Sequence, residues 1–298
     1  MLAKLLCTDL IMLHPLMRLY YKYKLGTQGI VYMLHRVGKK EKGGVSYNEN
    51  LKISPEYLEK VILSYRNQGF DFFSVDDLYE YLQKGRKQKK PFVVFTLDDG
   101  YIDNYTVAYP IFKKYNIPFC VYVATDFPDK RAFLWWYALS EFLEGIPDKD
   151  SRFVELRKKV LALPKEHFIK NFEDLLPTFE LNSLKYVCQE TMTWQQIKEM
   201  SINPLCTIGG HTVSHPSFVS LSEQEIRSEI EEGVKIIENH IGKRVCHFAY
   251  PYGSLNEVNE REYKIAEQYG FKTIMTTLSG GVSTKTNRCR IHRYMLSE

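Results

Sequence analysis

The stretch Phe92-Val93-Val94-Phe95-Thr96-Leu97-Asp98-Asp99-Gly100 decides how this chain folds. It begins with an apolar run, bounded upstream by Pro91 and a basic cluster, and such a run predicts a buried strand. Two adjacent carboxylates therefore stand where a core strand ends and a glycine turn begins. Burying a carboxylate is costly unless it is paired, hydrogen-bonded or bound to a metal. Strand ends in barrels and open α/β sheets are where active sites are built. The alternative is an ordinary surface turn, for which Asp-Gly is common.

Predicted strands and helices alternate along most of the chain. Ser54 and Pro55 begin a helix that Gly69 ends, because they supply an N-cap and a proline at the first helical position. Further helices are predicted at 74–85, 104–115, after Thr193, at 221–242 and at 257–269. Further strands are predicted at 29–35, 72–73, 118–123, 245–250, 271–276 and 289–294, with another ending at Ile208. This spacing predicts parallel βα units, so the expected fold class is α/β.

Residues 127–190 break this alternation. They are rich in helix formers and prolines, and we predict a mostly helical insertion or lid there. The stretch Leu134-Trp135-Trp136-Tyr137 stands near its beginning. These rings are expected to anchor the insertion in the core, and the alternative is a platform for a sugar ring over the site.

The composition is that of an ordinary globular protein. The chain has 298 residues, of which 44% are hydrophobic and 26% charged, enough for one large α/β domain or two smaller ones. A net charge of +4 is too small to indicate nucleic-acid binding, and no such partner is predicted. The six cysteines are scattered without a C-x-x-C pair, which is compatible with a reducing compartment. Nothing in the sequence indicates an oligomeric state.

Residues 1–27 form a segment of different character. Apolar residues recur up to Leu19, but Asp9 and His14-Pro15 interrupt them, and no A-x-A cleavage site follows. These features argue against a cleaved signal peptide and against a membrane-spanning helix. The run then meets interleaved basic and aromatic residues at 18–24, which is typical of a helix on a membrane surface. A helix packed on the domain or on a partner is an equal alternative.

A second signal lies in Gly209-Gly210-His211-Thr212-Val213-Ser214-His215-Pro216. It places two imidazoles four residues apart after a predicted strand, and the proline favours a tight loop over a regular helix. Together with Asp99, His211 and His215 make a ligand set that suits catalytic Zn²⁺ with one open position, and other divalent metals as well. The histidines without such a setting are expected to be structural: His35, His167, His240 and His247.

The chain resembles the polysaccharide deacetylases of the NodB-homology type, carbohydrate esterase family four. Thr96-Leu97-Asp98-Asp99-Gly100 is similar to the T-F-D-D-G motif of that family, and His211-Thr212-Val213-Ser214-His215 matches its H-[ST]-x-x-H motif. Phe248-Ala249-Tyr250-Pro251-Tyr252-Gly253 matches its third motif, R-x-P-Y-G, apart from the arginine. Three motifs in the right order make the resemblance specific. It implies a distorted (β/α) barrel of about seven strands, to which the helical insertion predicted at 127–190 is added.

The resemblance also implies a role for each motif residue. Asp99, His211 and His215 hold a divalent metal, expected to be Zn²⁺, with Co²⁺, Ni²⁺ or another divalent ion as alternatives. The metal lowers the pKa of its bound water and polarises the acetyl carbonyl. Asp98 is the general base that takes the proton of this water. The backbone N–H of Tyr252 helps to stabilise the tetrahedral oxyanion.

Two departures from the family pattern affect catalysis. Ala249 stands where the third motif often carries an arginine that pairs with the base, so Arg290 or Arg293 on the last predicted strand is the expected substitute. The general acid of the family is a histidine in a late L-x-H motif, and the only late histidine here is His292. We predict His292 as the acid, and the alternative is that it faces solvent.

These observations predict a metal-dependent hydrolase that removes acetyl groups from N-acetylated sugars of a cell-surface polysaccharide or its precursor. The alternatives are an acetyl esterase or a cyclic amidohydrolase on the same fold, and a non-catalytic glycan-binding relative. The expected organisation is an N-terminal segment at 1–27 and a deacetylase domain at 28–298 with its insertion at 127–190. The apparent lack of a signal peptide and the basic aromatic N-terminus predict a cytoplasmic location, peripheral at the inner membrane face.

Overall fold

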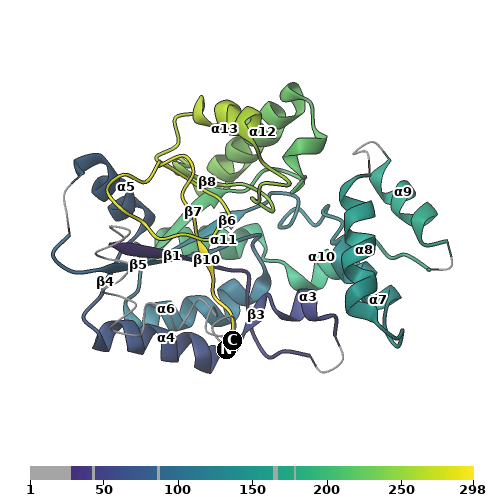
Figure 1. The fold of residues 1–298 in the computed structure, drawn as a ribbon, viewed down its shortest axis with the longest axis horizontal. Helices are drawn as coiled ribbons and strands as arrows, with labels where there is room; N and C mark the ends of the chain where they lie inside the picture. Colours follow the sequence, from purple (N-terminus) through teal and green to yellow (C-terminus); the bar gives the residue numbers. More distant parts are fainter. Residues whose placement is uncertain (1–27, 42–43, 86–87, 164–166, 178) are drawn as a thin grey trace.

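The computed structural model describes residues 28–41, 44–85, 88–163, 167–177 and 179–298, and Figure 1 shows their arrangement. A parallel sheet occupies the middle, with its strands in the order β10-β1-β5-β6-β7-β8-β9 and with β4 pairing with β5. Helices α4 and α6 lie on one side of these strands in Figure 1, and α12 and α13 lie on the other. The α/β fold class and the distorted (β/α) barrel are thereby confirmed.

The strands of this sheet are short, and those in the middle of the sheet are buried. They are β1 (Gly29–Leu34), β4 (Asp71–Phe72), β5 (Phe92–Leu97), β6 (Phe119–Val123), β7 (Cys206–Gly210), β8 (His247–Ala249), β9 (Thr273–Met275) and β10 (Tyr294–Met295). Strands β1, β5 and β6 are buried along their whole length, which explains why each is a nearly continuous apolar run. A second sheet joins β2 (Arg36–Val37) to β3 (Lys52–Ile53).

The C-terminal segment brings the two edges of the curled sheet together. Ile291 forms an isolated parallel bridge with Met275 of β9, and Tyr294 then pairs with Tyr32 of β1. The segment crosses from one edge to the other, so it cannot stay a regular strand throughout. The prediction of one strand over 289–294 was therefore wrong in its bounds.

The helices of the barrel begin largely at the residues that the capping signals predict. They are α3 (Ser46–Glu49), α4 (Pro55–Asn67), α5 (Val75–Lys84), the π-helical turn η2 (Asn104–Ala108), α6 (Tyr109–Tyr115), α11 (Trp194–Ile202), the 3-10 turn η3 (Phe218–Ser220), α12 (Glu223–Ile241) and α13 (Glu260–Glu267). Ser54 caps α4 by accepting a hydrogen bond from the Tyr57 N–H, and Ser74, Thr193 and Ser222 each form a capping box.

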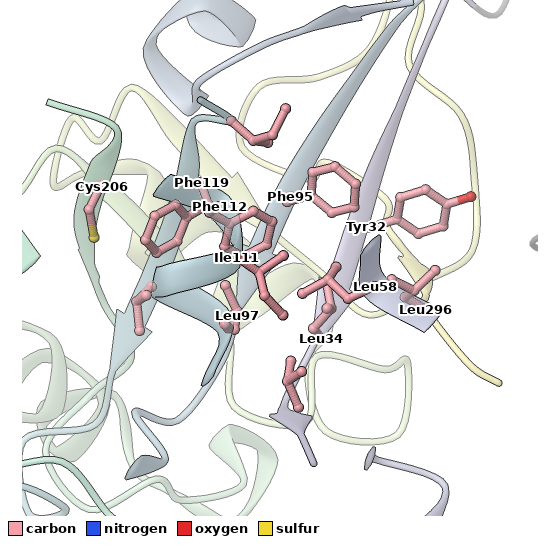
Figure 2. Close-up of a cluster of buried hydrophobic side chains, with 14 of the residues drawn as sticks. Tyr32, Leu34, Leu58, Phe95, Leu97, Ile111, Phe112, Phe119, Cys206 and Leu296 are labelled. Atoms are coloured by element: carbon pink, nitrogen blue, oxygen red, sulfur yellow. The ribbon is translucent and has the colours of Figure 1, made fainter. Parts of the chain in front are cut away.

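The main hydrophobic core lies between the sheet and helices α4 and α6. Figure 2 shows side chains from β1 and β5 gathered with those of both helices. Because alternate residues of a strand share a face, Phe95 and Leu97 of β5 both enter this core. The rings of Phe95 and Phe112 of α6 lie 5.5 Å apart, centroid to centroid. Each side chain of this size stabilises the fold by about 1.5–3 kcal/mol when fully buried.

In the described part of the predicted insertion the structure has four helices, α7 (Trp135–Phe142), α8 (Lys149–Leu161), α9 (Phe168–Leu175) and α10 (Lys185–Glu190). They lie together beside the sheet on the right of Figure 1. Arg36 of β2 joins them to the barrel. Its guanidinium pairs with Asp103 at 2.6 Å and with Glu190 of α10 at 2.7 Å, and it donates to the hydroxyl of Tyr137 in α7. This network fixes the insertion beside the end of β1.

The N-terminal helix predicted at 1–27 lies outside the described residues. Within the described ranges, no helix is both long and apolar enough to cross a bilayer. The five cysteines that the structure describes are all free.

Candidate metal centre and active site

A cavity of about 370 Å³ lies at the carboxyl ends of the central strands. Asp98 and Asp99 reach it from the loop after β5, His211 and His215 from the loop after β7, and Tyr252 from the loop after β8. Because the carboxyl ends of parallel strands meet at the same edge, loops far apart in the sequence converge there. The structure thus brings five of the six predicted site residues together.

The two carboxylates after β5 are both buried and both line this cavity. Asp98 is 2% exposed and Asp99 is 3% exposed. Adjacent residues of a regular strand point to opposite faces, but Asp99 adopts a left-handed backbone with φ of +76°. This conformation ends the alternation and lets both side chains reach the same cavity. The Asp-Asp pair is therefore part of a buried site and not an ordinary surface turn.

Asp99, His211 and His215 form a compact cluster. One ligand atom from each residue lies within 4.8 Å of the others. The Asp99 Oδ1 atom is 3.3 Å from His211 Nε2 and 3.2 Å from His215 Nε2. His211 Nδ1 lies 2.7 Å from the carbonyl oxygen of Ala249. Because a carbonyl only accepts, Nδ1 carries the proton, and in the neutral imidazole His211 Nε2 then presents its lone pair to Asp99.

This arrangement fits a bound cation. The Asp99 Oδ1 atom is buried and accepts no hydrogen bond from any residue that the structure describes. An acceptor oxygen and an imidazole lone pair therefore face each other, which a cation between them would satisfy. A histidine whose other nitrogen donates to a backbone carbonyl is the usual form of a metal ligand. Two histidines and one carboxylate also match the donor set of catalytic Zn²⁺ sites.

Glu229 of α12 holds the histidine loop, and the sequence reasoning missed it. Its Oε2 atom accepts hydrogen bonds from the backbone N–H groups of Val213 and Ser214, both at 2.9 Å, and its Oε1 atom accepts one from the Ser214 hydroxyl at 2.6 Å. Thr212 and His215 have left-handed backbones, with φ of +74° and +56°. Such strained conformations persist only where the surroundings impose them, and the buried Glu229 carboxylate is one such constraint.

Asp98 is held by Arg293. The guanidinium donates from Nη1 to Asp98 Oδ1 and from Nη2 to Asp98 Oδ2, both at 2.7 Å. Arg293 is fully buried, and it also donates to the Thr276 carbonyl at 2.9 Å and to the Thr96 hydroxyl at 3.0 Å. Burial alone would raise the pKa of the Asp98 carboxyl, but the charge and hydrogen bonds of Arg293 outweigh burial and hold that pKa below its usual value.

Arg293 therefore takes the place of the arginine that is absent at Ala249. Arg290, the other expected substitute, pairs instead with the exposed Glu260 of α13. Of the two expected substitutes, Arg293 is therefore the one that pairs with Asp98.

Tyr252 stands in the tight turn after β8 with a left-handed backbone, φ +57°. Gly253 follows at φ +55°, and a Cβ there would lie 2.9 Å from the backbone N of Thr277, so the turn requires glycine. The Tyr252 ring packs on His215, with centroids 4.7 Å apart. Its backbone N–H donates to no acceptor within the described residues. That N–H is available to a ligand oxygen, and its role at the oxyanion stays a prediction.

His292 is absent from the residues that line the cavity. Its ring lies close against Gly280, and burial lowers its pKa. The geometry gives no support to His292 as the general acid, and that role stays a prediction.

His35, which we expected to be structural, lines the cavity together with Asp98 and Asp99. Its Nδ1 atom is buried and makes no hydrogen bond within the described part of the chain. Burial lowers the pKa of His35 although the two aspartates act in the opposite direction. The signal that could have identified it is its position, because His35 directly follows the buried strand β1 as Asp98 follows β5.

Trp135 and Trp136 anchor the insertion and also form a wall of the site. They are 4% and 8% exposed, as expected for core anchors. The Trp136 indole donates to the Tyr101 hydroxyl at 3.0 Å, and the Trp135 indole donates to the Tyr252 hydroxyl at 3.3 Å. Both tryptophans also line a neighbouring cavity of about 600 Å³ between the insertion and the histidine loop.

Comparison with known proteins agrees with this geometry. The family model described as polysaccharide deacetylase matches residues 85–274, which include the Asp-Asp pair and the histidine loop. The polysaccharide deacetylase homologue YxkH of Bacillus subtilis (strain 168) is 21% identical over 253 residues, which cover 85% of this chain and 68% of that protein.

Three solved structures share the fold. The deacetylase PplD of Streptococcus pyogenes, in complex with acetate, has a TM-score of 0.64 at 20% identity, covering 90% of this chain and 92% of its own. A de-N-acetylase from Aggregatibacter actinomycetemcomitans has a TM-score of 0.61 at 19% identity, covering 90% and 95%. IcaB from Ammonifex degensii has a TM-score of 0.60 at 20% identity, covering 91% and 93%. With its motifs and the family match over most of its length, this chain belongs to the polysaccharide deacetylase family of hydrolases.

Proposed function

We propose that this protein is a metal-dependent deacetylase that hydrolyses the acetamide group of an N-acetylated sugar. The observation that carries the proposal is the placement of Asp98 and the Asp99, His211 and His215 cluster in one buried cavity. Hydrolysis of an acetamide needs a base that takes a proton from water and an electrophile that polarises the carbonyl. The cavity offers a base and a cation site side by side.

The residues around the cation site divide the work. Asp99, His211 and His215 would hold the ion, and their donor set suits Zn²⁺. When bound, such an ion polarises the acetyl carbonyl and makes a water molecule more acidic. Asp98 accepts the proton of the attacking water, because Arg293 keeps its carboxylate ionised and fixes its orientation.

Two further groups serve the later steps. The Tyr252 backbone N–H donates to the oxygen that becomes negative as water adds to the acetyl carbon. The protonated form of His35 gives its proton to the sugar nitrogen as the carbon–nitrogen bond breaks, and the proton that Asp98 took from water balances this loss. Among the described histidines, His35 shares the cavity with Asp98 without belonging to the cation cluster. This proposal transfers to His35 the role that the sequence predicts for His292.

The walls of the cavity suit a sugar. Trp135, Trp136 and Tyr252 supply aromatic faces next to the cation site, and a volume of about 370 Å³ lies within the usual range of small-molecule sites. Proteins of the same fold include a de-N-acetylase and a deacetylase in complex with acetate. These relatives favour the carbon–nitrogen bond of an acetamide as the bond that is cleaved. We propose that the sugar belongs to a cell-surface polysaccharide or its precursor. We also propose that the protein is cytoplasmic and peripheral at the inner membrane face, with residues 1–27 as the contact.

Acetate release tests this function. Full-length protein with Zn²⁺ is assayed on a panel of N-acetylated sugars and one acetyl ester, and wild type is compared with Asp98→Asn. Removal of a general base lowers the rate by about 10²–10⁴-fold, and that loss on an N-acetylated sugar is the expected result. Equal rates for wild type and Asp98→Asn would contradict the assignment of the base, and turnover of the ester alone would contradict the assignment of the bond.

A further inference from the structure

An arginine from the helical insertion reaches the mouth of the same cavity. Arg157 of α8 lines the cavity that holds Asp98 and Asp99. Its guanidinium lies close to two aromatic rings, with Cζ 5.1 Å from the ring centre of Tyr47 and 5.7 Å from that of Tyr252. Tyr47 is 38% exposed, so this end of the cavity opens toward solvent.

The guanidinium is one aromatic ring away from the cation site. Tyr252, whose ring Arg157 faces, packs its ring on His215 with a centroid distance of 4.7 Å. Arg157 and the cation cluster line the same cavity, so a sugar whose acetamide lies at the cluster occupies a space that Arg157 borders. The position of this arginine suits recognition of a substituent and not the hydrolysis itself.

The hydrogen-bonding capacity of Arg157 is largely unused. Its nearest acidic partner is Glu257, whose Oε1 atom lies 3.8 Å from Arg157 Nη2, beyond hydrogen-bond distance. The other oxygen of Glu257 accepts a hydrogen bond from the Ser254 hydroxyl. The Nε–H of Arg157 is buried and has no acceptor among the residues that the structure describes. Because a buried donor without a partner is costly, an acceptor that reaches this N–H would stabilise the site.

No other lysine or arginine among the described residues lines this cavity. Arg293 lies behind Asp98, and its N–H groups are directed at Asp98, Thr96 and Thr276. The arginine and lysine charge that lines the cavity is therefore concentrated at Arg157, whose ion pair with Glu257 is long, at 3.8 Å, and leaves its N–H groups able to donate to a ligand. A guanidinium presents a rigid fork of donors that matches the paired oxygens of a carboxylate or phosphate.

We propose that Arg157 binds an anionic group of the substrate, so that the enzyme prefers acetylated sugars that also carry a phosphate ester or a carboxylate. This inference rests on the proposed deacetylase function and adds to it the chemical class of the sugar. The insertion, in this account, supplies the residue that selects the substrate, while the barrel supplies the residues that hydrolyse it.

The test compares three probes with full-length protein and Zn²⁺: the methyl glycoside of N-acetylglucosamine, its phosphate monoester and its uronic acid. We expect kcat/KM to be higher for at least one acidic probe than for the neutral probe by about tenfold or more, as for a charge-assisted bidentate contact. Arg157→Met should abolish this preference, mainly by raising KM for the acidic probe. Arg157→Lys should retain part of it, because the charge remains and the fork is lost. Comparison of the phosphate probe with the carboxylate probe shows which anionic group Arg157 binds.

Arg152→Met is the matched control, since Arg152 lies on the same helix and is exposed. It should leave the preference unchanged. Equal kcat/KM for neutral and acidic probes, or an equal loss on all probes in Arg157→Met, would overturn the inference while leaving the deacetylase function intact.

Calorimetric binding of the corresponding deacetylated sugars separates the two proposals. We expect wild type and Arg152→Met to bind the acidic products more tightly than the neutral product, and Arg157→Met to bind acidic and neutral products equally. This result supports anion binding by Arg157 even if no probe is hydrolysed. Absence of acetate release from every probe would count against the proposed function. Equal binding of neutral and acidic products to wild type would overturn the role of Arg157.

Discussion

Arg293 donates two 2.7 Å hydrogen bonds to Asp98 in the interior of the barrel, where both side chains are buried. Asp98 follows β5, whereas Arg293 belongs to the C-terminal segment that joins the two edges of the sheet. The same contact therefore orients the proposed base and links it to the segment that closes the barrel. A buried pair of this kind is strongly destabilising when only one partner is removed, because the other charge is left without compensation.

Arg293→Met should destabilise the protein. The expected loss in the free energy of unfolding is about 3–5 kcal/mol, because Asp98 is left as a buried, unpaired carboxylate. Urea unfolding of the metal-free protein measures it. Arg290→Met is the matched control and should leave stability nearly unchanged, since Arg290 pairs with the exposed Glu260.

The double variant Asp98→Asn/Arg293→Met should recover part of this loss, because both charges are then removed together. If the double variant is less stable than Arg293→Met by the full effect of Asp98→Asn, the two side chains act independently and the pair has no energetic coupling.

The same pair predicts acid sensitivity of the metal-free protein. Arg293 holds the pKa of Asp98 below that of an unfolded aspartate, which is about 3.9. A carboxyl with a lowered folded-state pKa contributes its full stability above the unfolded pKa, and that contribution is lost as the pH falls through the folded pKa. The stability advantage of wild type over the double variant should therefore shrink as the pH is lowered below about 4 in urea titrations. An advantage that grows as the pH falls would contradict the ionised pair.

His35 and His292 should differ sharply in their effect on catalysis. His35→Gln is expected to lower kcat on an acetamide by about 10²–10⁴-fold, because the departing amine loses its proton donor. The loss should be smaller on an acetyl ester with an acidic leaving group, which departs without that proton. His292→Gln should leave both rates nearly unchanged, since His292 does not line the cavity. The reverse pattern, with His292→Gln the slower variant on the acetamide, would restore His292 as the acid.

Glu229→Gln should weaken metal binding without touching a ligand. The carboxylate accepts from two backbone N–H groups and one hydroxyl of the histidine loop, and an amide oxygen cannot accept all three equally well. Supporting contacts of this kind are worth about 10–100-fold in metal affinity, which calorimetric titration with Zn²⁺ measures. Glu232→Gln, an exposed change on the same helix, is the control. Equal affinities for the two variants would show that the loop keeps its shape without Glu229.

The sequence predicts the site correctly where residues close together in the chain carry the chemistry. Asp98 and Asp99 follow an apolar run directly, and His211 and His215 lie four residues apart after another. Strand ends converge in any parallel βα fold, so their meeting follows from the fold class. The capping residues likewise predicted the beginnings of most barrel helices.

The remainder depends on which strands become neighbours. The sequence left two candidates, Arg290 and Arg293, for the arginine that pairs with Asp98. Only the path of the C-terminal segment, which crosses from β9 to β1, shows that Arg293 is the partner. His35 is a single residue without a partner motif, and only the pairing of β1 with β5 brings it beside Asp98. Glu229 is a single charged residue in the middle of α12, and nothing in the sequence shows that this position is buried against the histidine loop.

The proposed activity depends on a catalytic metal held by Asp99, His211 and His215 and on the adjacent Asp98 as the base. The most direct measurement combines zinc content with acetate release for wild type, Asp99→Asn and Asp98→Asn after metal removal and readdition of Zn²⁺. Wild type should lose activity on metal removal and recover it with bound zinc, Asp99→Asn should lose both zinc and activity, and Asp98→Asn should keep zinc without activity. Full acetate release from metal-free wild type, or undiminished zinc affinity in Asp99→Asn, would contradict the account.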